Sequence, residues 1–401
     1  MKAHVLIVRA ARIGALALTV GFVGCGGDST PTKNAGNNDV AGSGGRDTGG
    51  TLGAGGAVGS GGAAGGAIGS SAEAAAGGGG RAGGSAGAAG GRGGAAGVPA
   101  GGAAGGRGGS AGAPVGASLL GWQLTTTNVG LAAHGLGCDA LPAYTGSLKP
   151  ESGARISNVR ITGPLDLSNG DIIVEKSCIR PTSVGYHNSF LVTTTICAGD
   201  GCSATALGKV IVRDSEVDAS GLSASTIATS CAFLGVGTVQ RNYMHGMGSG
   251  ICFFETGTEL DALAEQNYVT GLRSYGDSHN EAATIRDFRK NAANTRTVKF
   301  INNRLDCSSG NETGGLFIQP TWLPIYNVTV EGNYLEGGGY NLYLEATGNA
   351  TYGNVHSNNN RFRSTGWGPS AVSSGPGWTT WSNNYLYDAM RPDGKGAVVN
   401  P

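Results

Sequence analysis

An excess of either charge is absent from this chain of 401 residues. Lysine and arginine together number 27, aspartate and glutamate together also number 27, and the formal net charge is zero. A nucleic-acid-binding protein usually carries a basic surface that attracts phosphates, and a neutral chain lacks this electrostatic signature. The composition therefore predicts no nucleic-acid partner.

Aromatic residues are missing from a long stretch of the chain, because none occurs between Ala41 and Ala117. That stretch is a low-complexity segment of Gly, Ala and Ser, which holds 34 of the 76 glycines. Such a segment cannot bury enough apolar surface to offset the entropy lost on ordering its backbone. We expect residues 25–117 to form a disordered Gly/Ala/Ser-rich tether.

A membrane-spanning run is absent from the N-terminus, since Ile13–Val23 is shorter than the roughly 20 apolar residues of a spanning helix. Basic residues precede this short run, as is typical of an export signal. The ending Phe22-Val-Gly-Cys25 resembles the lipobox of bacterial lipoproteins. The resemblance implies that residues 1–24 are a lipoprotein signal peptide, that Cys25 is lipidated, and that a lipid anchor holds the protein at the outer membrane or cell surface. The alternative is an ordinary secretory signal.

A short phrase recurs through the C-terminal two-thirds of the chain. It reads as an apolar residue, two spacers, Asn, one spacer and a large apolar residue, as in Val239-Gln-Arg-Asn242-Tyr-Met244. Self-similarity that recurs at intervals of roughly 20–50 residues predicts a solenoid of stacked repeats. The Asn position, here called the slot, is occupied successively by Ser177, Ser215, Asn242, Asn267, Asn303, Asn333, Asn360 and Asn384.

Apolar residues lie at fixed distances from the slot. Val239, Phe300 and Val330 stand three positions before it, and alternation with a period of two predicts that such side chains share one face of a strand. One coil has no core of its own, but coils stacked in parallel form a continuous apolar interior. Because Asn tolerates a left-handed bend and its amide can bond to the next coil, we expect a ladder of stacked Asn side chains. The alternative is a row of ligand-binding amides.

This pattern resembles the right-handed parallel β-helix, or pectin-lyase-like, repeat proteins over about residues 120–390. Gly121–Leu124, Ile179–Pro181 and Gly337–Tyr343 are similar to a bacterial branch of that superfamily. The resemblance implies an all-β fold, a single-stranded right-handed parallel β-helix over residues 118–401, and a monomer. A β-propeller would need sets of four antiparallel strands in each repeat, whereas a single phrase marks each repeat here.

Zinc-type cysteine spacing is absent, and eight cysteines in an exported chain indicate disulfides instead. With Cys25 lipidated, seven remain, so one is expected to stay a thiol. Cys197 and Cys202 can close a small loop, and Cys231 and Cys252 can face each other on neighbouring coils.

A second strand is expected after each Asn turn. With Ile251, Ala283, Leu316 and Leu342 pointing inward, one outward column is Phe254, Arg286, Gln319 and Glu345, and its neighbour is Cys252, Thr284, Phe317 and Tyr343. Polar and aromatic groups stacked on a rigid sheet favour a saccharide groove. In contrast, we expect the Tyr and Arg residues that directly follow the slots to stack on one another, with stacking on sugars as the alternative. We expect Trp322, Tyr326, Trp378 and Trp381 to pack loops and the C-terminal cap, with Trp367 as the exception.

The densest group of ionisable residues lies before and on one of these strands. Asp277 and Glu281 offer oxygen ligands for Ca²⁺. His279, Arg286 or Lys290 can abstract the proton next to a uronate carboxylate while the ion neutralises that carboxylate, although arginine is a difficult base because its pKa exceeds about 12. The expected substrate-binding residues are Tyr275, Arg289, Gln319, Tyr343 and Glu345. The alternative is a solvated loop whose charges pair with each other.

Two signatures of enzymes with this fold are missing. The chain has neither the paired aspartates of polygalacturonase-like hydrolases nor the Arg-x-Pro-x-x-Arg strand of the main pectate lyases. The expected function is a surface-anchored protein that cleaves an acidic, uronate-containing polysaccharide by Ca²⁺-assisted β-elimination. The alternative is a non-catalytic glycan-binding, adhesive or structural surface module, because fold alone does not decide function.

Overall fold

The computed structural model of the chain describes residues 118–198, 201–205, 208–254, 260–288, 296–309, 312–363 and 366–401. The predicted signal peptide, the tether and the lipidation of Cys25 lie outside these residues, and so do the candidate residues Arg289 and Lys290. No helix in the described part is long and apolar enough to cross a membrane.

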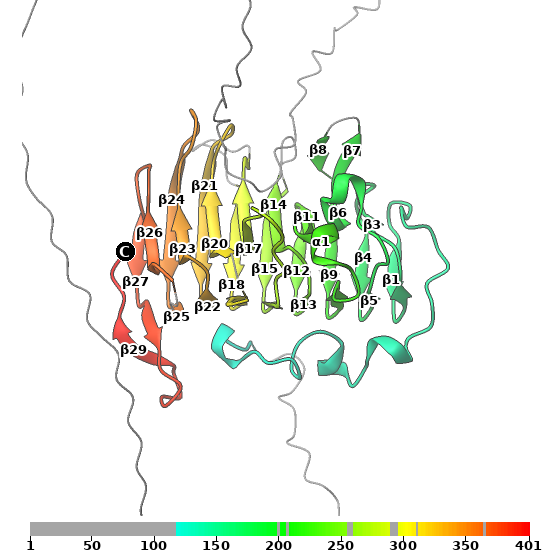
Figure 1. The fold of residues 1–401 in the computed structure, drawn as a ribbon, viewed down its shortest axis with the longest axis horizontal. Helices are drawn as coiled ribbons and strands as arrows, with labels where there is room; N and C mark the ends of the chain where they lie inside the picture. The colour runs from blue at the N-terminus through cyan, green and yellow to red at the C-terminus, as the bar shows by residue number, and fades with distance from the viewer. Residues whose placement is uncertain are drawn as a thin grey trace, which may run out of the picture. The chain divides into compact units, whose positions relative to one another are not determined.

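The described strands form three long sheets, and neighbouring strands in each sheet come from successive coils (Figure 1). The nine-stranded sheet contains β1 (Arg155–Ser157), β4 (Ile173–Glu175), β9 (Ile211–Arg213), β12 (Thr238–Gln240), β15 (Ala262–Glu265), β18 (Val298–Ile301), β21 (Ile325–Glu331), β24 (Tyr352–Asn358) and β27 (Thr380–Ser382). The ten-stranded sheet contains β2 (Arg160–Ile161), β5 (Cys178–Ile179), β10 (Glu216–Asp218), β13 (Tyr243–His245), β16 (Tyr268–Thr270), β19 (Arg304–Cys307), β22 (Tyr334–Gly337), β25 (Arg361–Arg363), β28 (Tyr385–Tyr387) and β29 (Lys395–Val398).

The third sheet has eight strands and completes each coil. It contains β3 (Leu165–Asp166), β6 (Phe190–Thr193), β11 (Cys231–Gly235), β14 (Ser249–Phe254), β17 (Asn280–Arg286), β20 (Glu312–Gln319), β23 (Tyr340–Leu344) and β26 (Gly368–Val372). Pairing in the three sheets is parallel, except that β29 returns antiparallel to β28. A hairpin of β7 (Thr195–Ala198) and β8 (Gly201–Thr205) and the short helix α1 (Ala224–Ile227) interrupt the coils. The all-β parallel β-helix is confirmed.

The core follows the register expected from the repeat. Val239 pairs with Ala264, Ala264 with Phe300 and Phe300 with Val330, and all four side chains are fully buried. Because each coil adds an apolar residue directly above its predecessor, the stack buries one continuous apolar column that a single coil cannot bury.

The slot residues form the predicted ladder inside the coil. The side-chain amide of Asn242 donates to Oδ1 of Asn267 at 3.0 Å, and Asn267 donates in the same way to Asn303 at 2.9 Å. Each amide also donates to a backbone carbonyl of the preceding coil, such as Val212 for Asn242. The side-chain amides can be buried because these hydrogen bonds replace the ones that they would otherwise make with water.

The position of the left-handed bend differs from the prediction. The positive φ angles fall on the residue before the slot, with 52° at Arg241, 54° at Gln266 and 56° at Asn302. The slot residue therefore does not itself make the bend. Its side chain is instead held inside the coil by hydrogen bonds to the neighbouring slots.

Disulfides fasten the early coils. Cys231 is bonded to Cys252, as predicted, and Cys138 is bonded to Cys178. Cys307 remains a buried thiol and donates a hydrogen bond to the carbonyl oxygen of Gly314. The backbones of Cys197 and Cys202 pair in the β7–β8 hairpin, but their side chains lie outside the described part, so their bond stays a prediction. Two disulfides indicate an exported protein.

Residues 118–145, here called the strap, lie across the ten-stranded sheet and run from late coils back to the first (Figure 1). The backbone nitrogen of Gly121 donates to the carbonyl oxygen of Gly332, and that of Gly130 donates to Arg241. Beneath the strap, the guanidinium of Arg304 lies 4.6 Å from the ring centre of Tyr268. The predicted self-stacking of the Tyr and Arg residues after the slots is therefore confirmed, and the strap covers much of this column.

Candidate functional site

The outward surface of the eight-stranded sheet, here called the outer face, carries the two columns expected from the sequence. Phe254, Arg286 and Gln319 are in register, and so are Cys252, Thr284, Phe317 and Tyr343. The inward partners on these strands, Ile251, Ala283, Leu316 and Leu342, are fully buried. These four belong to the core cluster inside the coils, whereas Phe254, Arg286 and Gln319 are partly exposed. Of the second column only Tyr343 is partly exposed, because Cys252, Thr284 and Phe317 are buried.

Three of the predicted substrate-binding residues meet on the outer face. The side-chain amide of Gln319 donates to Oε2 of Glu345 at 2.9 Å, and the hydroxyl of Tyr343 donates to Oε1 at 3.1 Å. All three side chains are partly exposed. Burial raises the pKa of Tyr343, so its hydroxyl keeps the proton that it donates. The cluster presents hydrogen-bonding groups whose geometry is fixed before any ligand arrives.

An aromatic row borders this polar cluster. The rings of Phe317 and Tyr343 are stacked with centres 4.7 Å apart, Tyr340 lies 5.3 Å from Tyr343, and Trp367 meets Tyr340 edge-on at 5.4 Å. Trp367 has 76% of its surface exposed. The row therefore ends in an indole that the protein leaves in water.

A second exposed indole follows β20. Trp322 is 70% exposed, which contradicts the expectation that it packs a loop. Its loop is held firmly, because Oδ1 of Asp287 accepts hydrogen bonds from the backbone nitrogens of Thr321, Trp322 and Leu323. A firmly held loop thus presents an indole to solvent directly after the strand that carries Phe317 and Gln319.

Glu281 occupies an unusual environment at the start of β17. Its side chain is 1% exposed, and neither carboxylate oxygen has a hydrogen-bond partner. Burial raises the pKa of Glu281 to about 7, against the opposing influence of Arg286 and of the Ser249 hydroxyl. A carboxyl group that changes its protonation near neutral pH is typical of functional sites.

The loop before β17 places the other candidates differently. Tyr275, Asp277 and His279 are exposed, whereas Glu281 is buried. Asp277 and Glu281 belong to no group of three or more potential metal ligands in the described part of the chain, and the calcium site expected at these two residues stays a prediction.

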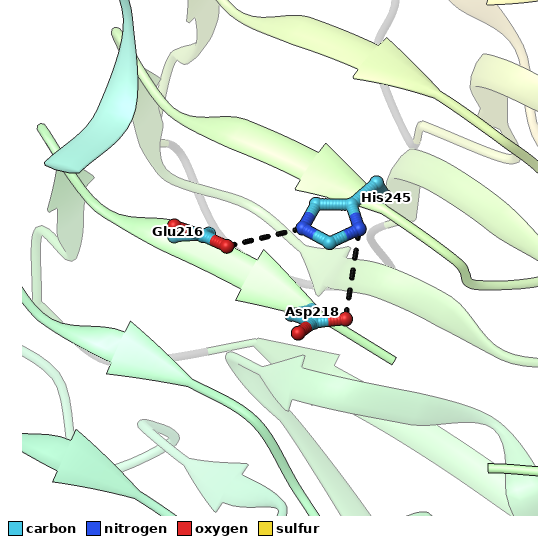
Figure 2. A group of neighbouring side chains, drawn as sticks. All are labelled: Glu216, Asp218 and His245. Atoms are coloured by element: carbon cyan, nitrogen blue, oxygen red, sulfur yellow. Dashed lines mark hydrogen bonds and ion pairs between the residues drawn. The ribbon is translucent and has the colours of Figure 1, made fainter. Parts of the chain in front are cut away.

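A group that can hold a metal ion lies on the ten-stranded sheet instead. Ligand atoms of Glu216, Asp218 and His245 lie within 4.8 Å of one another, and this is the one group of three or more such residues in the described part of the chain. Figure 2 shows the imidazole of His245 between the two carboxylates, with Nε2 3.1 Å from Glu216 and Nδ1 3.5 Å from Asp218. No metal identity follows from this geometry.

The same group is also satisfied as a network of ion pairs. Asp218 accepts a hydrogen bond from Nε of Arg180 at 2.7 Å and another from the backbone nitrogen of Ser220. Burial alone would raise the pKa of Asp218, but Ser220, His245 and Arg180 together lower it. An ion binds only one ring nitrogen, so a metal held by all three residues would displace one of the present contacts.

Sequence reasoning missed this group, although the repeat contains the signal for it. Asp218 and His245 stand at the same distance after their slots on neighbouring coils, and Glu216 lies two residues before Asp218. Since the three residues lie on the ten-stranded sheet and the outer face belongs to the eight-stranded sheet, the two candidate sites are separate.

Comparison with known proteins identifies no relative of this chain. The chain matches no family model, and neither a curated protein nor a solved structure matches it. The strand register therefore carries the assignment of the parallel β-helix, and the geometry of the outer face carries the assignment of the site.

Proposed function

We propose that the protein binds a polysaccharide on the outer face. The observation that carries this proposal is the aromatic row of Tyr343, Tyr340 and Trp367, which packs on the buried ring of Phe317 beside the polar pair Gln319 and Glu345. Sugar rings present apolar C–H faces that stack on aromatic rings, and hydroxyl groups that pair with amides and carboxylates. The two disulfides support work outside the cytoplasm, where polysaccharides are accessible.

The test is retention of the protein on immobilised polysaccharides of known composition. Trp367→Ala removes the exposed end of the row and should weaken binding by about tenfold or more, since stacked aromatic side chains commonly dominate binding energy. Met390→Ala removes another exposed side chain at the end of the coil stack and should bind as the wild type does. Equal loss in both variants, or no retention of the wild type on any polysaccharide, would contradict the proposal.

Cleavage of a uronate polymer by β-elimination is the second candidate. It is favoured by Arg286, which lies in register with Gln319 and can neutralise a substrate carboxylate, and by His279, an exposed proton acceptor on the loop before β17. Cleavage would create unsaturated ends that absorb ultraviolet light. His279→Ala should abolish this signal without changing retention, whereas a wild type that binds but yields no such products is a binding module.

Attachment to the membrane through Cys25 belongs to the same proposal. A lipid anchor and the Gly-rich segment at 25–117 would hold the β-helix outside the cell near its polysaccharide. Cys25→Ser should move the protein from the membrane fraction to the soluble exported fraction. An unchanged distribution would favour an ordinary secretory signal.

A further inference from the structure

The two exposed indoles belong to opposite ends of the strands that make the outer face. Trp367 directly precedes β26, whereas Trp322 is the third residue after β20. Because the strands of this sheet are parallel, their starts lie along one edge of the sheet and their ends along the other. The backbones that carry the two indoles therefore flank the outer face from its two edges.

Trp367 is seated against the backbone at the edge where the strands start. Its backbone nitrogen donates to the carbonyl oxygen of Gly339 at 2.6 Å, and a Cβ atom added at Gly339 would lie 2.8 Å from the indole ring. Tyr340, the first residue of β23, meets the same indole edge-on. The ring thus rests on the start of β23, while most of its surface stays in water.

The turn that carries Trp322 is fixed by the coils on both sides. Asp287 holds it from the preceding coil. From the following coil, the backbone nitrogen of Thr347 donates to the carbonyl oxygen of Pro320 at 2.9 Å, and the hydroxyl of Thr347 donates to that of Thr321 at 3.1 Å. An indole on a fixed backbone offers a large contact area and loses little conformational entropy when a ligand binds.

Partly exposed groups continue along the strand direction between these two edges. Tyr340 and Tyr343 lie on β23, and Glu345 directly follows it. In the direction of the stack, by contrast, the neighbours of Tyr343 are Phe317 and, one coil further, Thr284, and both are buried. The aromatic surface that a ligand can reach therefore runs along the strands and not along the stack.

The register sets the distance that a ligand would have to cover. Gly368 at the start of β26 pairs with Tyr340, and Tyr340 pairs with Gly314. Gln319 lies five residues beyond Gly314, which corresponds to about 17 Å along the strand, and the two steps from β26 to β20 add a sideways offset of about 10 Å. A single sugar ring cannot reach across this span, whereas an extended chain of several rings can.

We propose that the outer face binds the interior of a linear polysaccharide chain that runs along the strands from Trp367 to Trp322, with a sugar unit stacked on each indole. This inference rests on the proposed binding of a polysaccharide to the outer face. Both indoles are open to water, so the chain can continue beyond either of them. Trp322 is then a binding residue that selects long chains over short sugars.

The test uses a disaccharide and an octasaccharide cut from a polysaccharide that the full exported protein retains. The wild type should bind the octasaccharide about tenfold or more tightly than the disaccharide, because the longer chain gains a second stacked ring. Trp322→Ala should remove this gain and leave the affinity for the disaccharide unchanged, since the disaccharide binds at the aromatic row. Trp367→Ala should weaken both fragments, and Met390→Ala should weaken neither.

The outcomes separate this inference from the proposed function beneath it. If Trp367→Ala weakens binding but Trp322→Ala binds the octasaccharide as the wild type does, the course along the strands is wrong and polysaccharide binding stands. Equal affinity of the wild type for the two fragments would have the same meaning.

A chain that instead followed the stack along the edge where the strands start would meet Tyr275, which is exposed on the loop before β17. Loss of octasaccharide binding in Tyr275→Ala, together with no effect of Trp322→Ala, would establish that course and overturn ours. If no polysaccharide is retained by the wild type, the proposed function fails, and the role of Trp322 fails with it.

Discussion

At the residue scale, folding removes the carboxyl group of Glu281 from water, and the Ser249 hydroxyl and the charge of Arg286 offset this burial only in part. Its pKa is about 7 in the folded protein, compared with an ordinary value of 4.5. The folded state therefore holds the proton more tightly than the unfolded chain does. The contribution of this carboxyl group to the free energy of unfolding is fully present below about pH 4.5. It is lost as the pH rises through about 7, because the folded protein must then ionise a buried group.

Glu281→Gln should remove this loss. At pH 8 its free energy of unfolding should exceed that of the wild type by about 2–4 kcal/mol, because each unit of pKa shift corresponds to about 1.4 kcal/mol. At pH 4 the two proteins should be equally stable. Denaturant unfolding at both pH values measures the difference. Glu345→Gln is the control, because Gln319 and Tyr343 already satisfy that partly exposed carboxylate, and it should bring no gain at pH 8.

At the scale of elements, the strap depends on a close approach of two backbones. Gly121 donates to the carbonyl oxygen of Gly332, and a Cβ atom added at Gly121 would overlap the carbonyl oxygen of Asn303 and the backbone nitrogen of Tyr334. Only glycine can sit at this distance from the sheet. The start of the strap is thus fixed by the absence of a side chain, and its later part by the bond between Cys138 and Cys178.

Gly121→Ala should lift the start of the strap from the sheet. We expect it to cost about 1–3 kcal/mol of stability, as overpacking usually does, and to speed hydrogen exchange in residues 118–130. Gly137→Ala is the matched control on the same strap, because its backbone is extended and no atom lies within 4 Å of an added Cβ. Equal exchange of residues 118–130 in the two variants would show that the close approach does not hold the strap.

The elements differ in how far the sequence predicts them. The ladder and the outward columns follow from a repeated pattern, so Asn242 and Gln319 could be placed from spacing alone. The strap has no repeat, and its contacts depend on the shape of the finished sheet. The burial of Glu281 does not follow from the spacing, because the pairing of β17 with β20 shifts register between Asn280 and Glu281, and an irregularity of this kind leaves no mark in the repeat.

At the scale of the whole β-helix, the two ends of the coil stack are finished differently. The first coil is covered by the segment before it. The backbone nitrogen of Tyr144 donates to the carbonyl oxygen of Arg160, and the backbone nitrogen of Asp166 donates to the carbonyl oxygen of Leu148. The last coil leaves apolar side chains in water, with Met390 90% and Val398 67% exposed. Each coil is stabilised mainly by its neighbours, so a coil with one uncovered side should open most easily.

Opening should therefore begin at the C-terminal end. Hydrogen exchange of β25–β28 should be faster than that of β10–β14 by about tenfold or more, since local opening free energies vary widely within one structure. The difference should narrow after reduction, because the bond between Cys231 and Cys252 then no longer fastens the early coils. Uniform protection along the stack would mean that the β-helix opens as one unit and that its exposed end is no weaker than its middle.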